Sequence, residues 1–199
     1  MSDADQRPAF VALGGNLGGE RAVFARLCAA TAGLRERLHA CAIRASPVYR
    51  SAPVGPVQEQ PRFLNAVIVC SVPSALSPRD ILVQLLALEA SLGRRRDQSP
   101  AQGPRTIDLD LLFVAEERAA SPGPPRLSLP HPRIAERAFV LQPLADLQGL
   151  DWVMPGIGRS VGDCLGRPEV AAQRATLEPY PERLVTRVAA DPVNARVEP

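Results

Sequence analysis

The segment from Gly103 to Val114 restricts the fold most, because it has the pattern of one β-strand with two different faces. Its letters are GPRTIDLDLLFV, and the two acidic residues in it are Asp108 and Asp110. Successive side chains of a strand point to opposite faces. The two aspartates therefore share one face with Thr106, and the aliphatic residues between them point into a core. Because a wholly apolar Leu-Leu-Phe-Val follows, we expect this strand to be central in its sheet.

The two carboxylates on this strand suggest a metal site. Residues two apart along a strand are separated by roughly 6 to 7 Å. Flexible carboxylates at that spacing can bracket two cations roughly 3.5 to 4 Å apart, as in two-metal phosphoryl chemistry. An edge strand with a solvated acidic face is the alternative, and this segment alone leaves it open.

The order of the remaining elements predicts the fold class. Strand patterns cover residues 9–13, 40–45, 48–49, 63–72 and 106–114, and helical patterns cover 20–34 and 78–92. Ser77 is suited to begin the second helix and Gly93 to end it, whereas the proline-rich residues 52–62 form a loop. This βαββαβ order predicts an α+β sandwich with a mainly antiparallel sheet. We expect one domain over residues 1–165, followed by a poorly ordered extension over 166–199.

Composition excludes several classes of site. All 23 basic residues are arginine, so a Walker A loop or a lysine Schiff base is impossible. Four cysteines without a C-x-x-C pair and two histidines give no zinc ligand cluster. A formal net charge of +2 gives no argument for nucleic acid, and no apolar run approaches membrane-spanning length. With a polar N-terminus and no signal peptide, we expect a cytoplasmic protein.

Three further groups point to an anionic nucleotide and a flat heterocycle. The loop that must end beside the aspartates is flanked by Arg94, Arg95, Arg96 and Arg105, and a magnesium triphosphate needs metal on one side and guanidinium on the other. His131 is held between two prolines, so its imidazole is aimed. Phe63 and Asn65 offer an aromatic face and an amide. Taken alone, each group also fits a role without function: a solvated run of surface arginines, a structural histidine, or a phenylalanine of the hydrophobic core.

The combination resembles the 6-hydroxymethyl-7,8-dihydropterin pyrophosphokinase family of folate biosynthesis. The matching stretches occur in the family's order between residue 9 and about residue 165. They are ALGGNL (12–17), SPVYR (46–50), QPRFLNA (60–66), Leu88-Glu89 through Gly93-Arg94, GPRTIDLD (103–110), and Leu129-Pro130-His131 through Arg137-Ala138-Phe139.

The resemblance implies a ferredoxin-like α-β-α sandwich and an ATP-dependent diphosphokinase that releases AMP. It implies two Mg²⁺ ions per active site, held by Asp108 and Asp110, with ATP as co-substrate. The pterin would stack between Phe63 and Phe139, with Asn65 and residues Ala52, Pro53, Val54 and Gly55 recognising its edge. The ATP-binding set would be Glu89, Arg94, Arg105, Leu111, Arg126, Ser128, His131 and Arg137, and the catalytic set adds Arg96.

The sequence also departs from the family's pattern. Gln102 stands where the family often has Trp, Pro132 where some members have Tyr, and Leu86 where Gln can occur. Two alternatives remain: an inactive pterin- or nucleotide-binding module, and another two-metal nucleotidyl enzyme on a ferredoxin-like sheet. We expect a monomer that binds ATP and 6-hydroxymethyl-7,8-dihydropterin, without nucleic acid or membrane partners.

Overall fold

The computed structural model describes residues 5–96 and 103–185, and its centre is an antiparallel sheet. The strands are β1 (Gln6–Gly15), β2 (Cys41–Ala45), β3 (Tyr49–Ser51), β4 (Phe63–Pro73), β5 (Asp108–Val114) and β8 (Glu178–Pro179). Within the described ranges they are ordered β5-β1-β4-β3-β8, and β2 also pairs with β4. All these pairings are antiparallel, which confirms the expected mainly antiparallel sheet.

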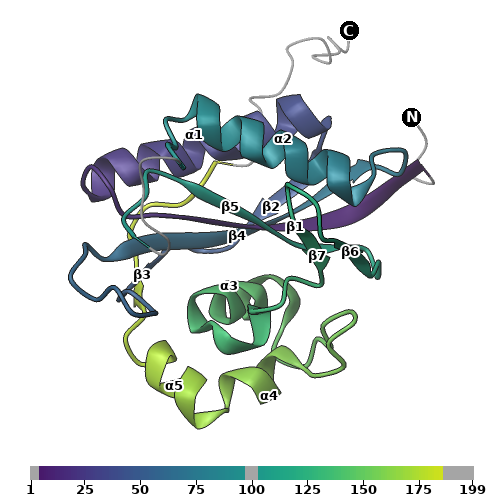
Figure 1. Ribbon diagram of the computed structural model, residues 1–199. Helices are drawn as coiled ribbons and strands as arrows, with labels where there is room; N and C mark the ends of the chain where they lie inside the picture. The colour runs from purple at the N-terminus through teal and green to yellow at the C-terminus, as the bar shows by residue number, and fades with distance from the viewer. Residues whose placement is uncertain (1–4, 97–102, 186–199) are drawn as a thin grey trace, which may run out of the picture.

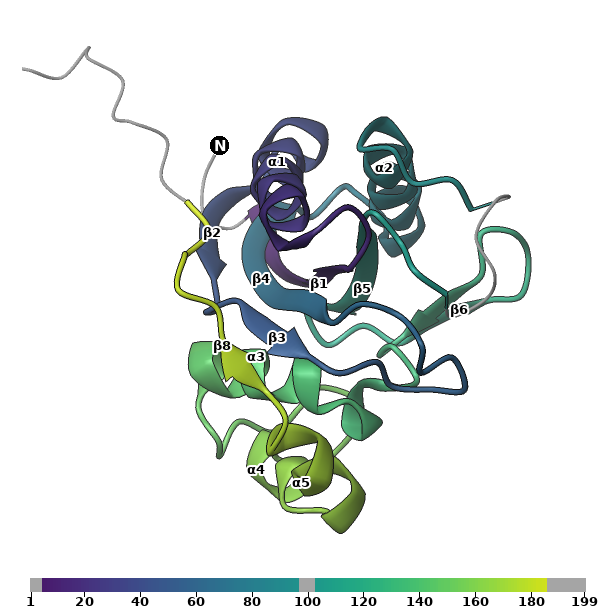
Figure 2. The same cartoon turned by 90° about the vertical axis from the view of Figure 1, so that its left-hand side faces the viewer.

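Helices cover both faces of the sheet, as Figures 1 and 2 show. Two long helices, α1 (Glu20–Leu38) and α2 (Pro78–Ser91), lie side by side on one face. Three shorter ones, α3 (Ala138–Gln148), α4 (Val161–Leu165) and α5 (Pro168–Arg174), lie on the other. A hairpin of β6 (Ala119–Ser121) and β7 (Leu127–Leu129) and a 3-10 turn (Ile134–Glu136) connect β5 to α3. The α-β-α sandwich is thus confirmed.

Two hydrophobic cores sit on the two faces, and β4 contributes to both. Its side chains alternate, so Ile68 packs in the core under α1 and α2, whereas Val67 and Val69 pack in the core against α3. This double burial explains why the strand has an apolar run rather than an alternating pattern. The long strands β1 and β4 therefore form a rigid floor for the residues at their ends.

The expected boundaries of α2 are confirmed. Ser77 and Asp80 form a reciprocal capping box, with the Asp80 N–H donating to the Ser77 hydroxyl at 3.1 Å. The helix ends before Gly93, whose φ of +91° suits glycine. The arginine-bearing loop therefore starts at a defined point beside the sheet.

The expected central position of the Asp108–Asp110 strand is wrong, because β5 is the edge strand of the sheet and pairs with β1. The Leu-Leu-Phe-Val run is apolar for another reason. Leu111 and Val114 pack in one core, and Leu112 and Phe113 pack in the other. A strand that is buried on both faces therefore needs apolar residues even when it is an edge strand with one neighbouring strand. At the outer edge of β5, the His131 N–H donates to the Leu112 carbonyl at 3.1 Å.

Residues 166–185, the described part of the extension expected over 166–199, pack against the rest of the domain. Val170 of α5 is fully buried and Leu184 is 7% exposed. Strand β8 pairs with β3. Just after β8, the ring of Tyr180 packs on Phe24, with the ring centroids 5.3 Å apart. Residues 186–199 lie outside the described part of the chain. In the ranges that are described, no helix is long and apolar enough to cross a membrane.

Candidate active site

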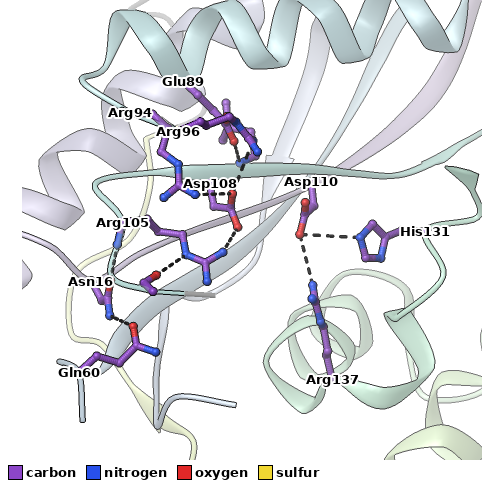
Figure 3. A network of polar contacts seen from close by, with 12 residues as sticks. Asn16, Gln60, Glu89, Arg94, Arg96, Arg105, Asp108, Asp110, His131 and Arg137 are labelled. Carbon is purple, nitrogen blue, oxygen red and sulfur yellow. Dashed lines mark hydrogen bonds and ion pairs between the residues drawn. The ribbon is translucent and has the colours of Figure 1, made fainter. Parts of the chain in front are cut away.

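Asp108 and Asp110 line one pocket at the start of β5, on the face of the sheet that carries α3. The expectation that they share a face is thus confirmed. Their side chains are 20% and 35% exposed, so both are open to a ligand. The pocket has a volume of about 700 Å³ with its open mouth included, and the ends of β1, β4 and β5 form its floor. Figure 3 shows the two carboxylates with the cationic side chains around them.

Cationic side chains converge on both carboxylates from different elements. Arg105 Nη1 donates to Asp108 Oδ2 at 2.6 Å. The Nη2 atoms of Arg94 and Arg96 lie 3.9 and 3.8 Å from Asp108 Oδ1. From the opposite side, Arg137 Nη1 lies 3.3 Å and His131 Nε2 lies 4.0 Å from Asp110 Oδ2. Five predicted site residues from the chain between 94 and 137 are therefore brought to the same two carboxylates.

Glu89 of α2 acts as an internal tie rather than an open ligand. Its side chain is 1% exposed, and its Oε1 accepts the Leu109 N–H at 2.7 Å. Its Oε2 accepts Arg96 Nε at 3.0 Å and Arg96 Nη2 at 2.5 Å. Burial raises the pKa of Glu89, and the Arg96 guanidinium opposes that shift. Glu89 therefore fixes both β5, between the two aspartates, and the arginine loop.

Arg94 has donors that no described residue uses. Its side chain is 10% exposed, and burial lowers its pKa while Asp108 opposes that shift. Its Nε and Nη1 atoms are buried without a hydrogen-bond partner among residues 5–96 and 103–185. Because a buried guanidinium is stable only when its donors are satisfied, this arrangement favours an anionic ligand.

Two phenylalanine rings line the pocket together with its polar groups. Phe63 begins β4, and Phe139 lies in the first turn of α3. Each ring is covered by an arginine, with Arg105 Cζ 5.3 Å from the Phe63 centroid and Arg137 Cζ 5.6 Å from the Phe139 centroid. The pocket thus has two aromatic surfaces that can take a cation or a flat ring.

Asn65 supplies a buried amide to the same pocket. It is 5% exposed, and its Nδ2 donates to the Ser51 hydroxyl at 2.9 Å. A Cβ at Gly14 would lie 3.0 Å from Asn65 Oδ1, so glycine on the adjacent strand leaves the amide room. Of the predicted loop positions, Ala52 and Val54 line the pocket, whereas Pro53 lines a neighbouring hollow. Gly55 has a φ of +130° in the turn of this loop.

Asn16, which joins the loops around the pocket, was not among the predicted site residues. Asn16 is 2% exposed, and its Oδ1 accepts the Arg105 N–H at 2.8 Å. Its Nδ2 donates to Gln60 Oε1 at 3.1 Å and to the Pro61 carbonyl at 2.9 Å. Gly15 permits this junction, because a Cβ there would lie 2.7 Å from the Thr106 carbonyl oxygen. The sequence signal for Asn16 was its place in the ALGGNL stretch (12–17). Ser51 and Arg133 also line the pocket, but neither was predicted as a site residue.

Six of the eight predicted nucleotide contacts lie outside the pocket lining. Three of them, Glu89, Arg94 and His131, contact the strand or the carboxylates of the aspartate pair, as described above. The other three are Arg126, Ser128 and Leu111. Arg126 and Ser128 are exposed in the β6–β7 hairpin, and the Leu111 side chain is buried in the core under α1 and α2. Leu86 is half-buried on α2 and Pro132 is exposed, whereas Gln102 lies outside the described residues.

The two aspartates fit magnesium that arrives with a nucleotide. In the described ranges, no group of three or more His, Cys, Asp or Glu residues is placed to hold a metal ion. Mg²⁺ is usually held by only one or two carboxylates together with substrate phosphates and water. The donor set at Asp108 and Asp110 satisfies that requirement, because both carboxylates face the pocket.

Comparison with known proteins identifies the family. Residues 10–149 match the model of 7,8-dihydro-6-hydroxymethylpterin-pyrophosphokinase, abbreviated HPPK. The chain belongs to the HPPK family. It is 41% identical over 138 residues to a 2-amino-4-hydroxy-6-hydroxymethyldihydropteridine pyrophosphokinase of Pseudomonas aeruginosa, covering 69% of this chain and 78% of that one. A protein of the same name from Synechocystis is 39% identical over 153 residues, covering 77% of this chain and 72% of that one.

Solved HPPK structures share the fold. A Plasmodium falciparum HPPK-DHPS with pterin and p-hydroxybenzoate superimposes with a TM-score of 0.61 at 16% identity, covering 89% of this chain. An HPPK-DHPS in complex with substrates superimposes with a TM-score of 0.58 at 13% identity, covering 80% of this chain. The match spans 47% and 43% of those two chains, respectively. These neighbours confirm the expected ferredoxin-like fold.

Proposed function

We propose that this protein transfers pyrophosphate from ATP to the hydroxymethyl group of 6-hydroxymethyl-7,8-dihydropterin and releases AMP, a step of folate biosynthesis. One observation carries the proposal. A single pocket joins two aromatic surfaces and a buried amide to an aspartate pair surrounded by arginines. The first half suits a flat, polar-edged heterocycle, and the second suits a magnesium triphosphate. A reaction between these two substrates needs both halves side by side.

The pterin ring occupies the space between Phe63 and Phe139. Each phenylalanine face is now covered by a guanidinium, so a stacked pterin replaces Arg105 on one ring and Arg137 on the other. Asn65 and the backbone of residues 52–55 recognise the edge of the ring, since an amide can both donate and accept. The displaced arginines then face the phosphates.

ATP binds on the aspartate side of the pocket. Asp108 and Asp110 would hold the two Mg²⁺ ions, which would supply charge neutralisation at the phosphates and would make the attacking hydroxyl more acidic. The triphosphate is held by the guanidinium groups of Arg94, Arg96, Arg105 and Arg137. Arg94 makes the strongest of these contacts, because two of its donors have no partner among the described residues and can both bind phosphate oxygens. Arg126, Ser128 and the Leu111 backbone are predicted to contact the nucleotide from outside the pocket lining.

The Nε2–H group of His131 is suited to donate a hydrogen bond to a phosphate oxygen. Its Nδ1 accepts the Arg133 N–H at 3.2 Å, which leaves the proton of a neutral imidazole on Nε2. Burial lowers the pKa of His131, with Asp110 opposing the shift, and this favours the neutral form. The Nε2 atom faces Asp110, on the phosphate side of the pocket.

The reaction then depends on position and electrostatics. The hydroxymethyl oxygen forms a bond to the β-phosphorus of ATP, and the bond from that phosphorus to the oxygen bridging the α- and β-phosphates breaks. AMP leaves with the bridging oxygen, the hydroxyl proton passes to water, and arginines neutralise the developing charge. No protein group among those described in the pocket is needed as a general base. An inactive binding module is less well supported, because the aspartates, arginines and His131 remain together in one site. Monomeric, cytoplasmic action without nucleic acid or membrane partners is part of the same proposal.

Product analysis tests the proposed function. Purified protein is mixed with Mg-ATP in the presence and absence of 6-hydroxymethyl-7,8-dihydropterin, and AMP and ADP are separated by chromatography. AMP formed only with the pterin supports pyrophosphoryl transfer. ADP would indicate transfer of the γ-phosphoryl group alone, and would contradict the proposal. Pterin binding without turnover would support the inactive module.

A further inference from the structure

The helix α5 lies outside residues 10–149, which the family model matches, yet its Gln173 lines a hollow that shares Ala52, Val54 and Phe139 with the substrate pocket. It packs beneath α3 on the face of the sheet that carries the site, as Figure 1 shows. Its single fully buried residue, Val170, joins the core that also contains Ala138 and Val140 of α3. The start of α3 and this helix therefore belong to one packed unit.

Gln173 of α5 makes two hydrogen bonds to the backbone at the start of α3. Its Oε1 accepts the Ala138 N–H at 3.2 Å, and its Nε2 donates to the Glu136 carbonyl at 2.9 Å. One planar amide thus holds the backbone on both sides of Arg137. Such a bidentate contact fixes position and direction together.

The start of α3 needs an external partner. Arg137 occupies the N-cap position and makes no side-chain capping bond, so the chain next to the helix does not satisfy the first N–H groups. Gln173 takes the place of the cap for Ala138. Residues 137 and 139 carry the guanidinium beside Asp110 and the aromatic wall, so the backbone that Gln173 holds directs both.

Next to the Gln173 contacts lies a hollow of about 590 Å³, its opening included, which Pro53, Phe139, Gln173 and Leu177 help to line. Polar contacts therefore accompany the apolar packing between α5 and the first turn of α3. The residues that follow α5 are also held near the pocket. Arg62 donates hydrogen bonds to the Glu178 carboxylate at 2.8 Å and to the Thr176 carbonyl at 3.1 Å.

We propose that Gln173 is a positioning residue for substrate binding: it fixes the first turn of α3 and so places Phe139 against the pterin and Arg137 beside Asp110. The proposal rests on the proposed function for its substrate, and on the two hydrogen bonds for its geometry. It places a determinant of pterin affinity outside the segment that defines the family.

A matched pair of substitutions tests this role. Gln173→Met keeps the length of the side chain and removes both hydrogen bonds. Arg174→Met, one residue further on, removes a different tie between the same two helices, from Arg174 Nε to Gln142 Oε1 at 2.8 Å, which lies away from the start of α3. Both variants are compared with the unaltered full chain for thermal midpoint, pterin dissociation constant by fluorescence, and amide exchange over residues 134–142.

We expect Gln173→Met to raise the pterin dissociation constant about tenfold and to speed exchange of the Ala138 amide, which loses its acceptor. Arg174→Met should change neither. Two results would overturn the proposal. One is a pterin affinity that is unchanged in both variants. The other is the same loss of affinity in both, because it would mean that the general docking of α5, and not the contact of Gln173, controls binding. If the unaltered protein forms no AMP and binds no pterin, the proposed function fails instead. Exchange at Ala138 then decides the positioning role, and an unchanged rate in Gln173→Met contradicts it.

Discussion

At the residue scale, two arginines each contact both an aromatic wall and a carboxylate. Arg105 covers Phe63 and donates to Asp108, whereas Arg137 covers Phe139 and lies beside Asp110. Substrates must therefore take over contacts that the protein already makes with itself. This exchange keeps the charges compensated before binding and leaves the arginines next to the phosphates afterwards.

Replacing Arg94 should stabilise the folded protein but weaken its binding of the nucleotide. Because two of its buried donors lack partners among the described residues, Arg94→Met should raise the free energy of unfolding by about 1 kcal/mol. The same change should raise the KM for Mg-ATP about tenfold or more, since a phosphate contact is lost. Denaturant melts and initial rates measure the two effects. Arg95→Met, at the exposed neighbouring position, is the control that should change neither. A destabilised Arg94→Met with normal KM would contradict this assignment.

At the element scale, the regular periodicities made much of the site predictable. A period of two places Asp108 and Asp110 on one face, and the Ser77 cap and Gly93 stop bound α2. The position of β5 at the sheet edge could not be predicted, because it depends on pairing partners rather than on the strand's own residues. Asn16 was missed for a similar reason, since its contacts are to residues 44 to 89 positions away.

The link between β3 and α3 should titrate at high pH. The Tyr49 hydroxyl donates to Asp146 Oδ2 at 2.7 Å, and burial together with this hydrogen bond raises the pKa of Tyr49 to about 12. A raised pKa in the folded state means that the bond's contribution to stability is complete below about pH 10 and is lost as the pH rises toward 12. Absorbance titration of the folded protein should show a tyrosinate step near that value, absent in Tyr49→Phe. A Tyr49 step below pH 10 would contradict the hydrogen bond.

At the scale of the whole molecule, the C-terminal segment completes the side of the sandwich that carries the site. Strand β8 lies against β3 at the sheet edge, and α5 lies against α3 (Figure 2). This packing could not be read from the sequence, because α5 is short and buries one apolar residue, which gives no visible periodicity. The HPPK-like order of motifs, by contrast, was readable because each motif is a contiguous run.

A pair of valine substitutions measures how firmly this segment is packed. Val170 is fully buried and Val185 is 74% exposed. Val170→Ala should lower the free energy of unfolding by about 2 kcal/mol, because it removes buried methyl groups and leaves a cavity. Val185→Ala should be neutral in the same urea titration. Equal, negligible effects would mean that the segment is as loosely packed as its composition suggested.

The rate of pterin-dependent AMP formation in Asp110→Asn tests the chemistry of the pocket most directly. We expect a fall of about a thousandfold or more, because metal-assisted charge neutralisation is lost, with pterin affinity within about twofold of the unaltered protein. Asp146→Asn, which changes a carboxylate outside the pocket lining, should keep full turnover. Undiminished AMP formation in Asp110→Asn would contradict the assignment of this carboxylate, and with it the proposed chemistry of the pocket.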